Sequence, residues 1–431
     1  MPSKVERETL TIDGREVSIS NPRKLLFPAA GLSKLDLVNY YLSVAEGALR
    51  GAAHRPNVLV RYPNGVDGEF FYQKRAPVPR PDWVEVVKLV FPSGHSTEEV
   101  VPRSAADLAW MANLGCIELH PHPVKVDDLE HPNELRVDLD PMPGVVWKDL
   151  QEVARVVRAA LADVGLEGWP KTSGSRGIHI LVRLEPRWSF SEVRRAALAL
   201  ARDVEQRVPR LATSKWWKEE RHGVFLDYNQ NAKDRTVASA YAVRPTQDAR
   251  VSAPVTWDEL DRCELADFTL RTMPARFAEL GDRHALIDRN PGSLERLLEL
   301  SARHEGEGHG DAPWPPHYTK QAGEPARVRP SAAKGAAKKK GSRVSRFPLI
   351  EIARAAKKSE AIEGLERWKL RHPEVAKRLA PTDVLTDSMR GRSSSWYRIR
   401  INLQHVPESE RPAQEALDPD FTPPEPRFEP E

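Results

Sequence analysis

Short strand-like runs alternate with helical runs over the first 300 residues of this 431-residue chain, and this alternation constrains the fold most. The helical runs cover residues 35–50, 146–165 and 190–208, and Ser33 is the predicted N-cap of the first. The strand-like runs are rich in β-branched and aromatic residues and read VLVRYP, VEVVKLV, GCIELHP, LRVDLDP, GIHILVRL, GVFLDYN and ASAYAVR. The sequence therefore predicts an α+β (mixed α/β) core.

The length of the chain predicts two or three domains, because a typical domain holds about 100–200 residues. Between Lys320 and Arg346, nine basic residues accompany one acid, Glu324, in a stretch rich in Gly, Pro and Ala. This composition predicts a flexible linker. The predicted parts are a large domain at 1–304, the basic linker at 305–345, a small α/β segment at 346–406 and an acidic, proline-rich disordered tail at 407–431.

Within the small segment, residues 349–370 read as a pair of amphipathic helices, and residues 393–404 read as a half-buried strand. Nothing in this segment indicates its role.

Composition excludes several classes of protein. No run approaches the ~18 apolar residues of a membrane span, and the N-terminus lacks a signal peptide, so we expect a cytoplasmic protein. Two cysteines, Cys116 and Cys263, are too few for a disulfide framework or a multi-cysteine metal site, and we expect both to be buried thiols. The net charge of +3 does not by itself indicate a nucleic-acid partner.

Two aspartates stand close together in the stretch RVDLDPMPG, residues 136–144. Residues i and i+2 of a strand point to the same face, so Asp138 and Asp140 project together and repel unless a cation lies between them. Such oxygen-rich pairs suit Mg²⁺ or Mn²⁺. Asp227 ends another strand-like run and would complete a site for two ions if the strands are neighbours. The alternative is a pair of solvated strand ends.

The stretch KTSGSRGIHILV, residues 171–182, combines glycines, hydroxyls and cations before a strand. Such a loop is suited to phosphate binding because backbone N–H groups can approach the ligand closely. His179 enters the strand that follows and could face the same phosphates, whereas the alternative is an ordinary turn with a core histidine. The stretch is neither a Walker A loop nor a GxGxxG fingerprint. His120 ends the GCIELHP run, upstream of the acidic strand.

In this order, the segments DLDP, KTSGSRGIH and FLDYNQN resemble the polymerase domain of bacterial DNA ligase D, a member of the archaeo-eukaryotic primase superfamily. The resemblance extends over roughly residues 10–300 through NPRKLLFP, GLSKLDLVNYY, VRYPNGVDGEFFYQK, NLGCIELHP and YAVRPTQDARVSAPVTWDEL. It implies a primase-type core of central sheets flanked by helices. It also implies a nucleotidyltransferase that binds two Mn²⁺ or Mg²⁺ ions and uses NTP or dNTP substrates.

The resemblance also implies roles for individual residues. The metal-binding catalytic carboxylates are Asp138, Asp140 and Asp227, and the nucleotide-binding residues are His120, Lys171, Ser173, His179 and Arg244. The site for a DNA 5′-phosphate is Asn21, Lys24 and Lys34, and the template and backbone contacts are Arg61, Phe70, Phe71 and Lys74. Because neighbours in a strand point to opposite faces, we expect Phe70 or Phe71 to lie in the core.

The sequence departs from the family in three ways. It contains no KxDG-type adenylation motif of a ligase and no phosphoesterase module, so we expect a stand-alone polymerase whose ligation partner is a separate protein. The residue before Arg61 is Val60, where some relatives carry a basic residue. The stretch GDRHA, residues 281–285, replaces the more usual GDPWA.

The expected function is gap filling and end extension in DNA repair, by end joining or excision repair, with a preference for ribonucleotides implied by the resemblance. The expected partners are gapped or 5′-phosphorylated primer–template DNA, Ku and a separate DNA ligase, and we expect a monomer associated with the nucleoid. Two alternatives remain open at this point. A three-carboxylate metal site also serves a nuclease or phosphodiesterase, and Lys24, Lys34 and the basic linker would serve a non-catalytic module that binds DNA ends.

Overall fold

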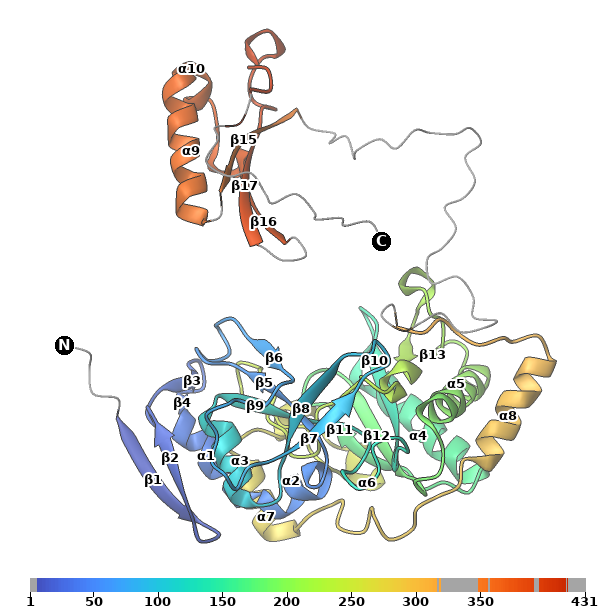
Figure 1. Cartoon of the computed structure of the whole chain (residues 1–431). Helices are drawn as coiled ribbons and strands as arrows, with labels where there is room; N and C mark the ends of the chain where they lie inside the picture. The colour runs from blue at the N-terminus through green and yellow to red at the C-terminus, as the bar shows by residue number, and fades with distance from the viewer. Residues whose placement is uncertain are drawn as a thin grey trace, which may run out of the picture. The chain divides into compact units, whose positions relative to one another are not determined.

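The computed structural model describes residues 6–315, 318, 348–355, 357–390, 395–415 and 417. The chain forms two compact units, residues 1–330 and residues 331–431 (Figure 1). Each unit has a hydrophobic core of its own.

The first sheet of the larger unit is built around the strand that carries the two neighbouring aspartates. Its order is β11 (Trp169–Thr172), β12 (Ile178–Arg183), β10 (Glu134–Pro141), β14 (Val224–Leu226) and β13 (Ala212–Thr213). Strand β10 pairs antiparallel with both β12 and β14, so it is central. The helices α4 (Trp147–Asp163) and α5 (Phe190–Arg207) pack against this sheet and against each other.

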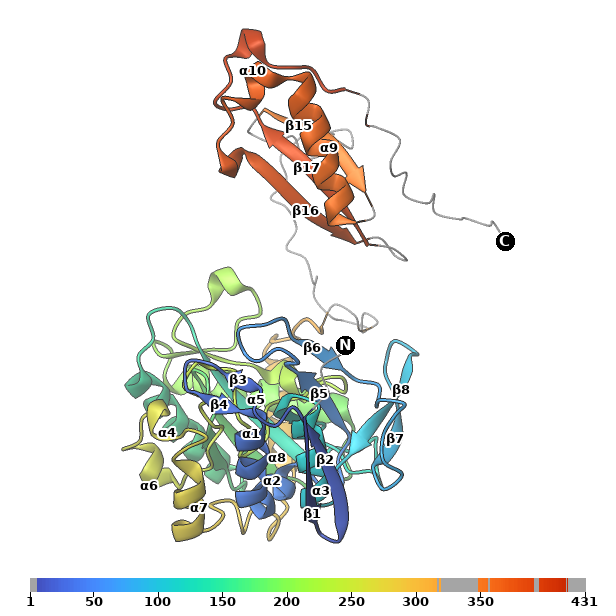
Figure 2. The same cartoon turned by 90° about the vertical axis from the view of Figure 1, so that its left-hand side faces the viewer.

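The second sheet of the larger unit faces the N-terminal helices (Figure 2). Strand β5 (Asn57–Arg61) pairs with β6 (Phe71–Gln73), with β8 (Ser96–Val101) and with β9 (Cys116–Pro121), and β7 (Glu85–Val90) pairs with β8. The helices α2 (Ala45–Ala52) and α3 (Ala105–Asn113) contact β9, and α1 (Lys34–Ser43) packs on α3.

Smaller elements complete the larger unit. A hairpin, β1 (Arg7–Ile12) with β2 (Arg15–Ser20), and a short pair, β3 (Leu25–Phe27) with β4 (Leu32–Ser33), precede α1. The 3-10 turn η1 (Lys218–Glu220) precedes β14, and η2 (Tyr228–Asn231) follows it. The later elements are α6 (Trp257–Leu260), η3 (Leu265–Asp267), α7 (Met273–Leu280) and α8 (Glu295–Gly306).

Most of the predicted elements of this unit are confirmed. Ser33 caps α1, since its hydroxyl accepts from the backbone N–H of Asp36 while the Asp36 carboxylate accepts from the Ser33 backbone. The predicted helix at 35–50 breaks at Val44 into α1 and α2. The predicted strand ASAYAVR, residues 238–244, is wrong: its backbone forms turns and one isolated bridge, from Val243 to Val251. Cys116 and Cys263 are buried thiols, as predicted.

The smaller unit is a three-stranded antiparallel sheet with one long helix. The sheet order is β15 (Leu349–Ala355), β17 (Ser395–Asn402) and β16 (Val384–Arg390). Helix α9 (Lys358–Arg371) packs on it through Ala361, Leu365 and Trp368, and α10 (Pro373–Ala376), η4 (Pro381–Asp383) and η5 (Glu408–Glu410) are short. The predicted pair of helices at 349–370 is therefore wrong in its first half. Residues 349–355 form a strand because Ile350, Ile352, Ala353 and Ala355 pack in the sheet core.

Packed structure extends past two of the predicted boundaries. Helix α8 ends at Gly306, and Asp311–Pro315 and Tyr318 pack on the larger unit, although the linker was expected to begin at residue 305. The predicted linker from 319 to 345 lies outside the described residues, as does most of the predicted tail from 407. Within the described part of that tail, Arg411 donates to the carbonyls of Leu403 and Val406. Across the part of the chain that the structure describes, every helix is too short or too polar to cross a membrane.

Candidate active site

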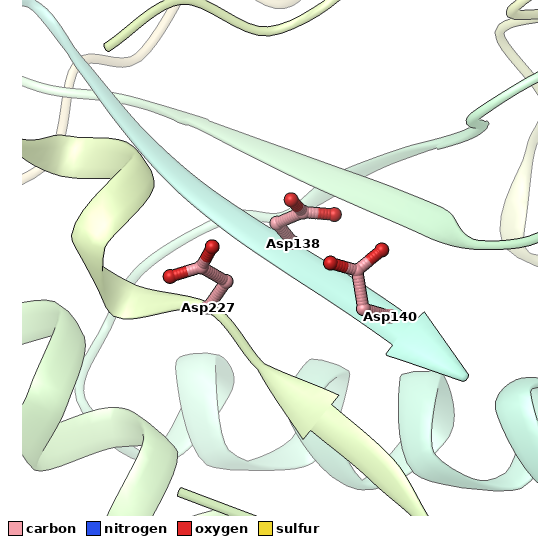
Figure 3. Close-up of side chains that lie close together, drawn as sticks. All are labelled: Asp138, Asp140 and Asp227. Atoms are coloured by element: carbon pink, nitrogen blue, oxygen red, sulfur yellow. The ribbon is translucent and has the colours of Figure 1, made fainter. Parts of the chain in front are cut away.

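Three carboxylates meet where β10 and β14 pair (Figure 3). Asp138 and Asp140 project from β10, and Asp227 follows the last residue of β14. The backbone N–H of Asp227 donates to the Asp138 carbonyl at 3.0 Å, which places Asp227 beside the two β10 side chains. One oxygen from each carboxylate lies within 4.8 Å of the other two. The sequence left open whether the strand before Asp227 neighbours the DLDP strand, and the structure pairs the two.

The environment of this triad opposes its negative charge. Burial raises the pKa of Asp138 well above its ordinary value, and the charges of Asp140 and Asp227 add to the effect. Partial desolvation also raises the pKa values of Asp227, which is half-buried, and of Asp140, whose side chain still contacts solvent. The buried Oδ1 of Asp138 accepts no hydrogen bond from any described residue. A carboxylate oxygen of this kind, next to two further carboxylates, fits an oxygen-ligated divalent cation.

A buried lysine and a histidine stand behind Asp138. Lys171 is fully buried, and its Nζ contacts His179 Nδ1 at 2.7 Å, the Ala238 carbonyl at 2.8 Å and Ser252 Oγ at 2.5 Å. His179 Nε2, on the other side of the ring, lies 3.3 Å from Asp138 Oδ1. Burial first, and then neighbouring cations, hold the pKa values of Lys171 and His179 well below their ordinary values.

Lys171 was predicted to bind nucleotide, but its burial leaves no surface for a ligand. In the structure Lys171 instead contacts His179 and fixes the orientation of its imidazole ring.

The predicted phosphate loop uses much of its donor capacity internally. Ser173 Oγ accepts from the backbone N–H groups of Ser175 and Gly177, at 3.1 Å and 2.9 Å. Gly177 also lies against β10, since a Cβ there would be 2.4 Å from the Leu139 carbonyl oxygen. The Arg176 side chain is exposed beside Asp140 and acts to lower the pKa of that carboxyl. The glycines therefore serve close packing, and the cation of Arg176 remains available to a ligand.

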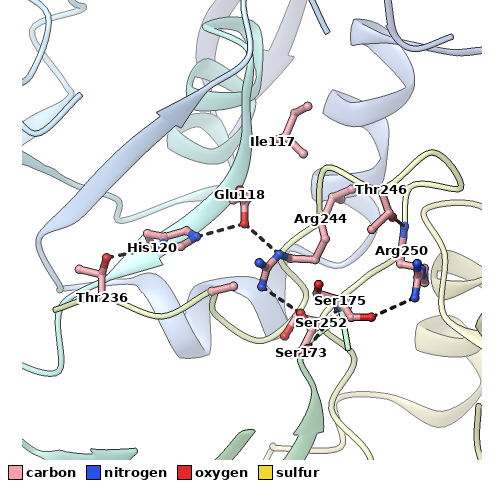
Figure 4. A network of polar contacts seen from close by, with 12 residues as sticks. Ile117, Glu118, His120, Ser173, Ser175, Thr236, Arg244, Thr246, Arg250 and Ser252 are labelled. Carbon is pink, nitrogen blue, oxygen red and sulfur yellow. Dashed lines mark hydrogen bonds and ion pairs between the residues drawn. The ribbon is translucent and has the colours of Figure 1, made fainter. Parts of the chain in front are cut away.

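A carboxylate on the second sheet organises the cationic side of the site (Figure 4). Glu118 Oε2 lies 2.8 Å from Arg244 Nε and 3.2 Å from His120 Nε2. Arg244 also donates to the Ser173 carbonyl at 2.9 Å, and Thr236 Oγ1 lies 3.4 Å from His120 Nδ1. Burial acts to raise the pKa of Glu118, but His120 and Arg244 outweigh it and lower the pKa. Glu118 is thus an ionised anchor for two of the predicted nucleotide-binding residues.

The sequence analysis did not find Glu118. The available signal was its position two residues before His120 on a strand, which places both side chains on one face.

The two sheets enclose a pocket of about 190 Å³. Its lining comprises His120, Asp138, Asp140, Ser173, Ser175, Arg176, Gly177, His179, Thr236, Val237, Ala238 and Arg244. The pocket therefore combines two carboxylates of the triad with two arginines. All of the predicted nucleotide-binding residues except Lys171 line it.

The predicted 5′-phosphate residues lie together near the start of α1. Lys34 is buried, and its Nζ donates to the Ser20 carbonyl at 2.6 Å. Burial, together with the charges of Lys24 and Arg61, lowers the pKa of Lys34 to about 8. Lys24 is exposed and donates to Asn64 Oδ1 at 3.1 Å. Asn21 adopts a left-handed backbone with φ of 48°, and its carbonyl accepts from the Lys24 N–H at 3.0 Å.

The aromatic residues near β6 form an exposed cluster. Phe70 and Phe71 are 50% and 44% exposed, so the prediction that one of them lies in the core is wrong. The ring of Phe70 stacks on Tyr62, and the Arg61 guanidinium lies over Phe71. Tyr72, which the sequence analysis did not single out, is 60% exposed. Strand β6 lies at the edge of its sheet and has only three residues. The aromatic side chains on this strand and just before it are left exposed.

Two other predicted backbone contacts have partners within the protein. Arg61 donates from Nε to the Leu114 carbonyl at 2.9 Å and from Nη1 to Gln73 at 2.8 Å. Lys74 Nζ lies over the ring of Phe91. Each guanidinium or ammonium group is therefore oriented before any ligand binds.

The comparisons with known proteins agree with this geometry. The LigD primase-polymerase domain matches residues 33–284, more than half of the chain. The multifunctional non-homologous end joining protein LigD of Mycolicibacterium smegmatis is 35% identical over 65% of this chain and 37% of its own length. The Pseudomonas aeruginosa protein of the same description is 33% identical over 68% of this chain and 35% of its own length.

The fold agrees as well. The polymerase domain of Mycobacterium tuberculosis ligase D, solved in complex with DNA, superposes with a TM-score of 0.60 at 34% identity. The match covers 64% of this chain and 99% of that domain. Our chain spans less than two fifths of the length of these two LigD relatives. It belongs to the LigD primase-polymerase family of nucleotidyltransferases.

Proposed function

We propose that this protein is a DNA-dependent nucleotidyltransferase that fills short gaps and extends 3′ ends during DNA repair. The observation that carries the proposal is the meeting of three carboxylates beside a pocket lined by Arg176 and Arg244. A polymerase needs this combination, because phosphoryl transfer depends on positioning and on neutralising the charge of the triphosphate.

Asp138, Asp140 and Asp227 are the residues that would hold two Mn²⁺ or Mg²⁺ ions. They fit such ions because their oxygens converge within 4.8 Å and because Asp138 Oδ1 lacks a hydrogen bond. When bound, the ions would activate the primer 3′-hydroxyl and stabilise the leaving pyrophosphate. That the two ions are Mn²⁺ or Mg²⁺ is part of the proposal.

The remaining residues bind and orient the nucleotide. Arg244 presents its guanidinium to the pocket while Glu118 and the Ser173 carbonyl hold it in place. Its charge, with that of Arg176, would compensate the triphosphate. His179 is kept neutral by its lowered pKa and lies beside Asp138. Its Nε2 would donate a hydrogen bond to the nucleotide. The preference for ribonucleotides in this proposal rests on the family.

The DNA contacts in the proposal lie on the second sheet and at α1. Lys24 and Lys34 would bind the 5′-phosphate across a gap, and Phe71 and Tyr72 would stack on template bases, each worth ~1–3 kcal/mol. The exposure of both rings and the DNA-bound state of the M. tuberculosis domain support this assignment.

The pathway that we propose is end joining, because the relatives are described as non-homologous end joining proteins. A separate DNA ligase would seal the product, Ku would be a partner at the DNA end, and the protein would act as a monomer at the nucleoid.

The test is extension of a labelled primer across a short gap with a downstream 5′-phosphate, with Mn²⁺ and with ribo- and deoxynucleotides in parallel. We expect extension by the wild type and none by Asp138→Ala/Asp140→Ala. The control is Glu167→Gln, at an exposed carboxylate between α4 and β11, which should extend normally.

Two results would contradict the proposal. Shortening of the primer would indicate a metal-dependent nuclease. DNA binding without extension by the wild type would indicate a non-catalytic module that binds DNA ends.

A further inference from the structure

A short segment beyond the residues matched by the family packs on the catalytic unit. We call this segment the strap and define it as Asp311–Pro315 and Tyr318. The family match ends at residue 284, so the resemblance says nothing about the strap. Its side chains form a small apolar cluster in which Trp314 and Tyr318 pack with Ala232, just after turn η2.

One buried arginine of α5 holds the strap. The Arg194 side chain is fully buried, and its Nη1 pairs with Asp311 Oδ1 at 2.7 Å. Its Nη2 donates to the carbonyls of Ala312 and Pro313, at 2.8 Å and 3.1 Å. The ring of Trp314 lies 4.2 Å from the guanidinium carbon. The strap therefore supplies the anion, two acceptors and an aromatic face for this cation.

The same guanidinium holds the turn that follows Asp227. Arg194 Nε donates to Asn229 Oδ1 at 2.7 Å, and the guanidinium carbon lies 5.3 Å from the centre of the Tyr228 ring. The backbone N–H of Asn229 donates in turn to Asp227 Oδ1 at 3.1 Å. One asparagine thus joins the buried arginine to a carboxylate of the triad.

The far end of the turn is fixed on β10. The Asn231 side chain accepts from the Arg136 N–H and donates to the Arg136 carbonyl, both at 2.9 Å. Further along, Tyr318 Oη accepts from the backbone N–H of Asp234 at 3.2 Å. Turn η2 is therefore held by Arg194 at one end and by β10 at the other, and the strap contacts both Arg194 and the segment that follows the turn.

We propose that Arg194 and the strap position Asp227 for metal binding, so that Asp311–Pro315 and Tyr318 support the catalytic centre of this chain. The inference rests on the proposed metal-dependent function and goes beyond it. Groups that orient metal ligands without touching the metal contribute strongly to affinity, and their loss costs ~10–100-fold. Removing the strap contacts should therefore weaken metal binding while α5 and both sheets stay folded.

The experiment uses the full chain with two strap variants, Trp314→Ala and Asp311→Asn. Asp311→Asn keeps the size of the side chain and gives the answer should Trp314→Ala fail to fold. Trp314→Phe retains an aromatic face over Arg194 but loses the hydrogen bond that Trp314 Nε1 donates to Asp311 Oδ2 at 2.8 Å, so it separates these two contributions of Trp314. The matched control is Arg195→Ala at the neighbouring position of α5, where the side chain is 39% exposed and pairs with Glu305 in α8.

Two measurements separate a positioning role from a structural one. The first is direct Mn²⁺ binding by titration calorimetry, at a temperature well below the melting temperature of each variant. The second is the Mn²⁺ concentration that gives half-maximal primer extension. We expect Trp314→Ala and Asp311→Asn to bind Mn²⁺ about tenfold more weakly or worse, with activity recovering at high Mn²⁺. Arg195→Ala should bind like the wild type, and Trp314→Phe should bind Mn²⁺ more tightly than Trp314→Ala.

The proposal is overturned if the strap variants bind Mn²⁺ with wild-type affinity and only melt at a lower temperature. It is also overturned if Arg195→Ala weakens binding to the same extent. A wild type that binds no Mn²⁺ would instead refute the proposed metal centre itself, and the inference with it.

Discussion

Replacing Asp138 by asparagine should stabilise the metal-free protein while it abolishes activity. Asp138 is buried, and its carboxylate oxygens lie within 4.8 Å of those of Asp140 and Asp227. At that separation two unit charges repel by about 3.5 kcal/mol for an effective dielectric constant near 20. Asp140 is exposed, so water screens part of this repulsion. We therefore expect Asp138→Asn to raise the free energy of unfolding by about 1–3 kcal/mol.

The sign of the pH dependence follows from the raised pKa values. A carboxyl whose pKa is raised by folding binds its proton more tightly in the folded state, so the unfolded state releases protons first. The stability of the metal-free protein should then fall as the pH rises from the ordinary carboxylate pKa, about 4, through the raised values. Saturating Mn²⁺ should reverse this fall, because it binds the ionised form of the folded state.

The assay is thermal unfolding of EDTA-treated protein followed by circular dichroism between pH 5 and 8, with and without Mn²⁺. A gain of 1 kcal/mol corresponds to about 2–4 °C in domains of 150–250 residues. Glu167→Gln is the control for removing one negative charge at an exposed site. The reasoning is refuted if Asp138→Asn melts at or below the wild-type temperature at pH 7.5, or if Mn²⁺ stabilises it as much as the wild type.

Two further predictions concern the flanking groups. Lys34, whose pKa is lowered to about 8 by burial and by the charges of Lys24 and Arg61, is protonated below that pH and loses its proton above it. The preference for 5′-phosphorylated over 5′-hydroxyl gaps should therefore shrink from pH 7 to pH 9 in binding titrations with the wild type, but persist in Lys34→Arg. Glu118→Gln should raise the KM for nucleotide by roughly tenfold with a smaller change in kcat, because a charged hydrogen bond that holds Arg244 contributes about 1.5–3 kcal/mol. An equal loss in both parameters from steady-state kinetics would contradict this role, and exposed Glu98→Gln on β8 is the control.

The triad was predictable from the sequence because strand periodicity and charge repulsion are local properties. Asp138 and Asp140 share a face in any strand, and an apolar run before Asp227 indicates a strand that ends at that residue. The segment at 349–355 shows the limit of such reasoning. LIEIARA fits a helical or a strand pattern, and its pairing with β17, more than 40 residues away, decides between them.

Contacts between distant segments account for what the sequence did not reveal about the site. Burial of Lys171 depends on Ala238 and Ser252, which lie 67 and 81 positions away along the chain. The strap reaches Arg194 from 117 positions away, through a segment whose Gly and Pro content is typical of a linker. The expectation that Phe70 or Phe71 is buried fails because it assumes that both lie in a strand with one covered face, whereas β6 begins only at Phe71 and both rings are exposed.

The chain from Lys171 through His179 to Asp138 explains how the site keeps its charge available. A lysine in direct contact with Asp138 would form a buried ion pair and would compete with a metal ion for the same oxygen. Here the imidazole stands between them, so Lys171 occupies neither oxygen of Asp138, and its charge only partly opposes the rise that burial causes in the pKa of Asp138. His179 Nε2 limits the rotation of the carboxylate from one side at 3.3 Å. Asp138 Oδ1 therefore has the His179 imidazole beside it but no hydrogen bond from any described residue, so this buried oxygen can serve as a ligand for a divalent cation.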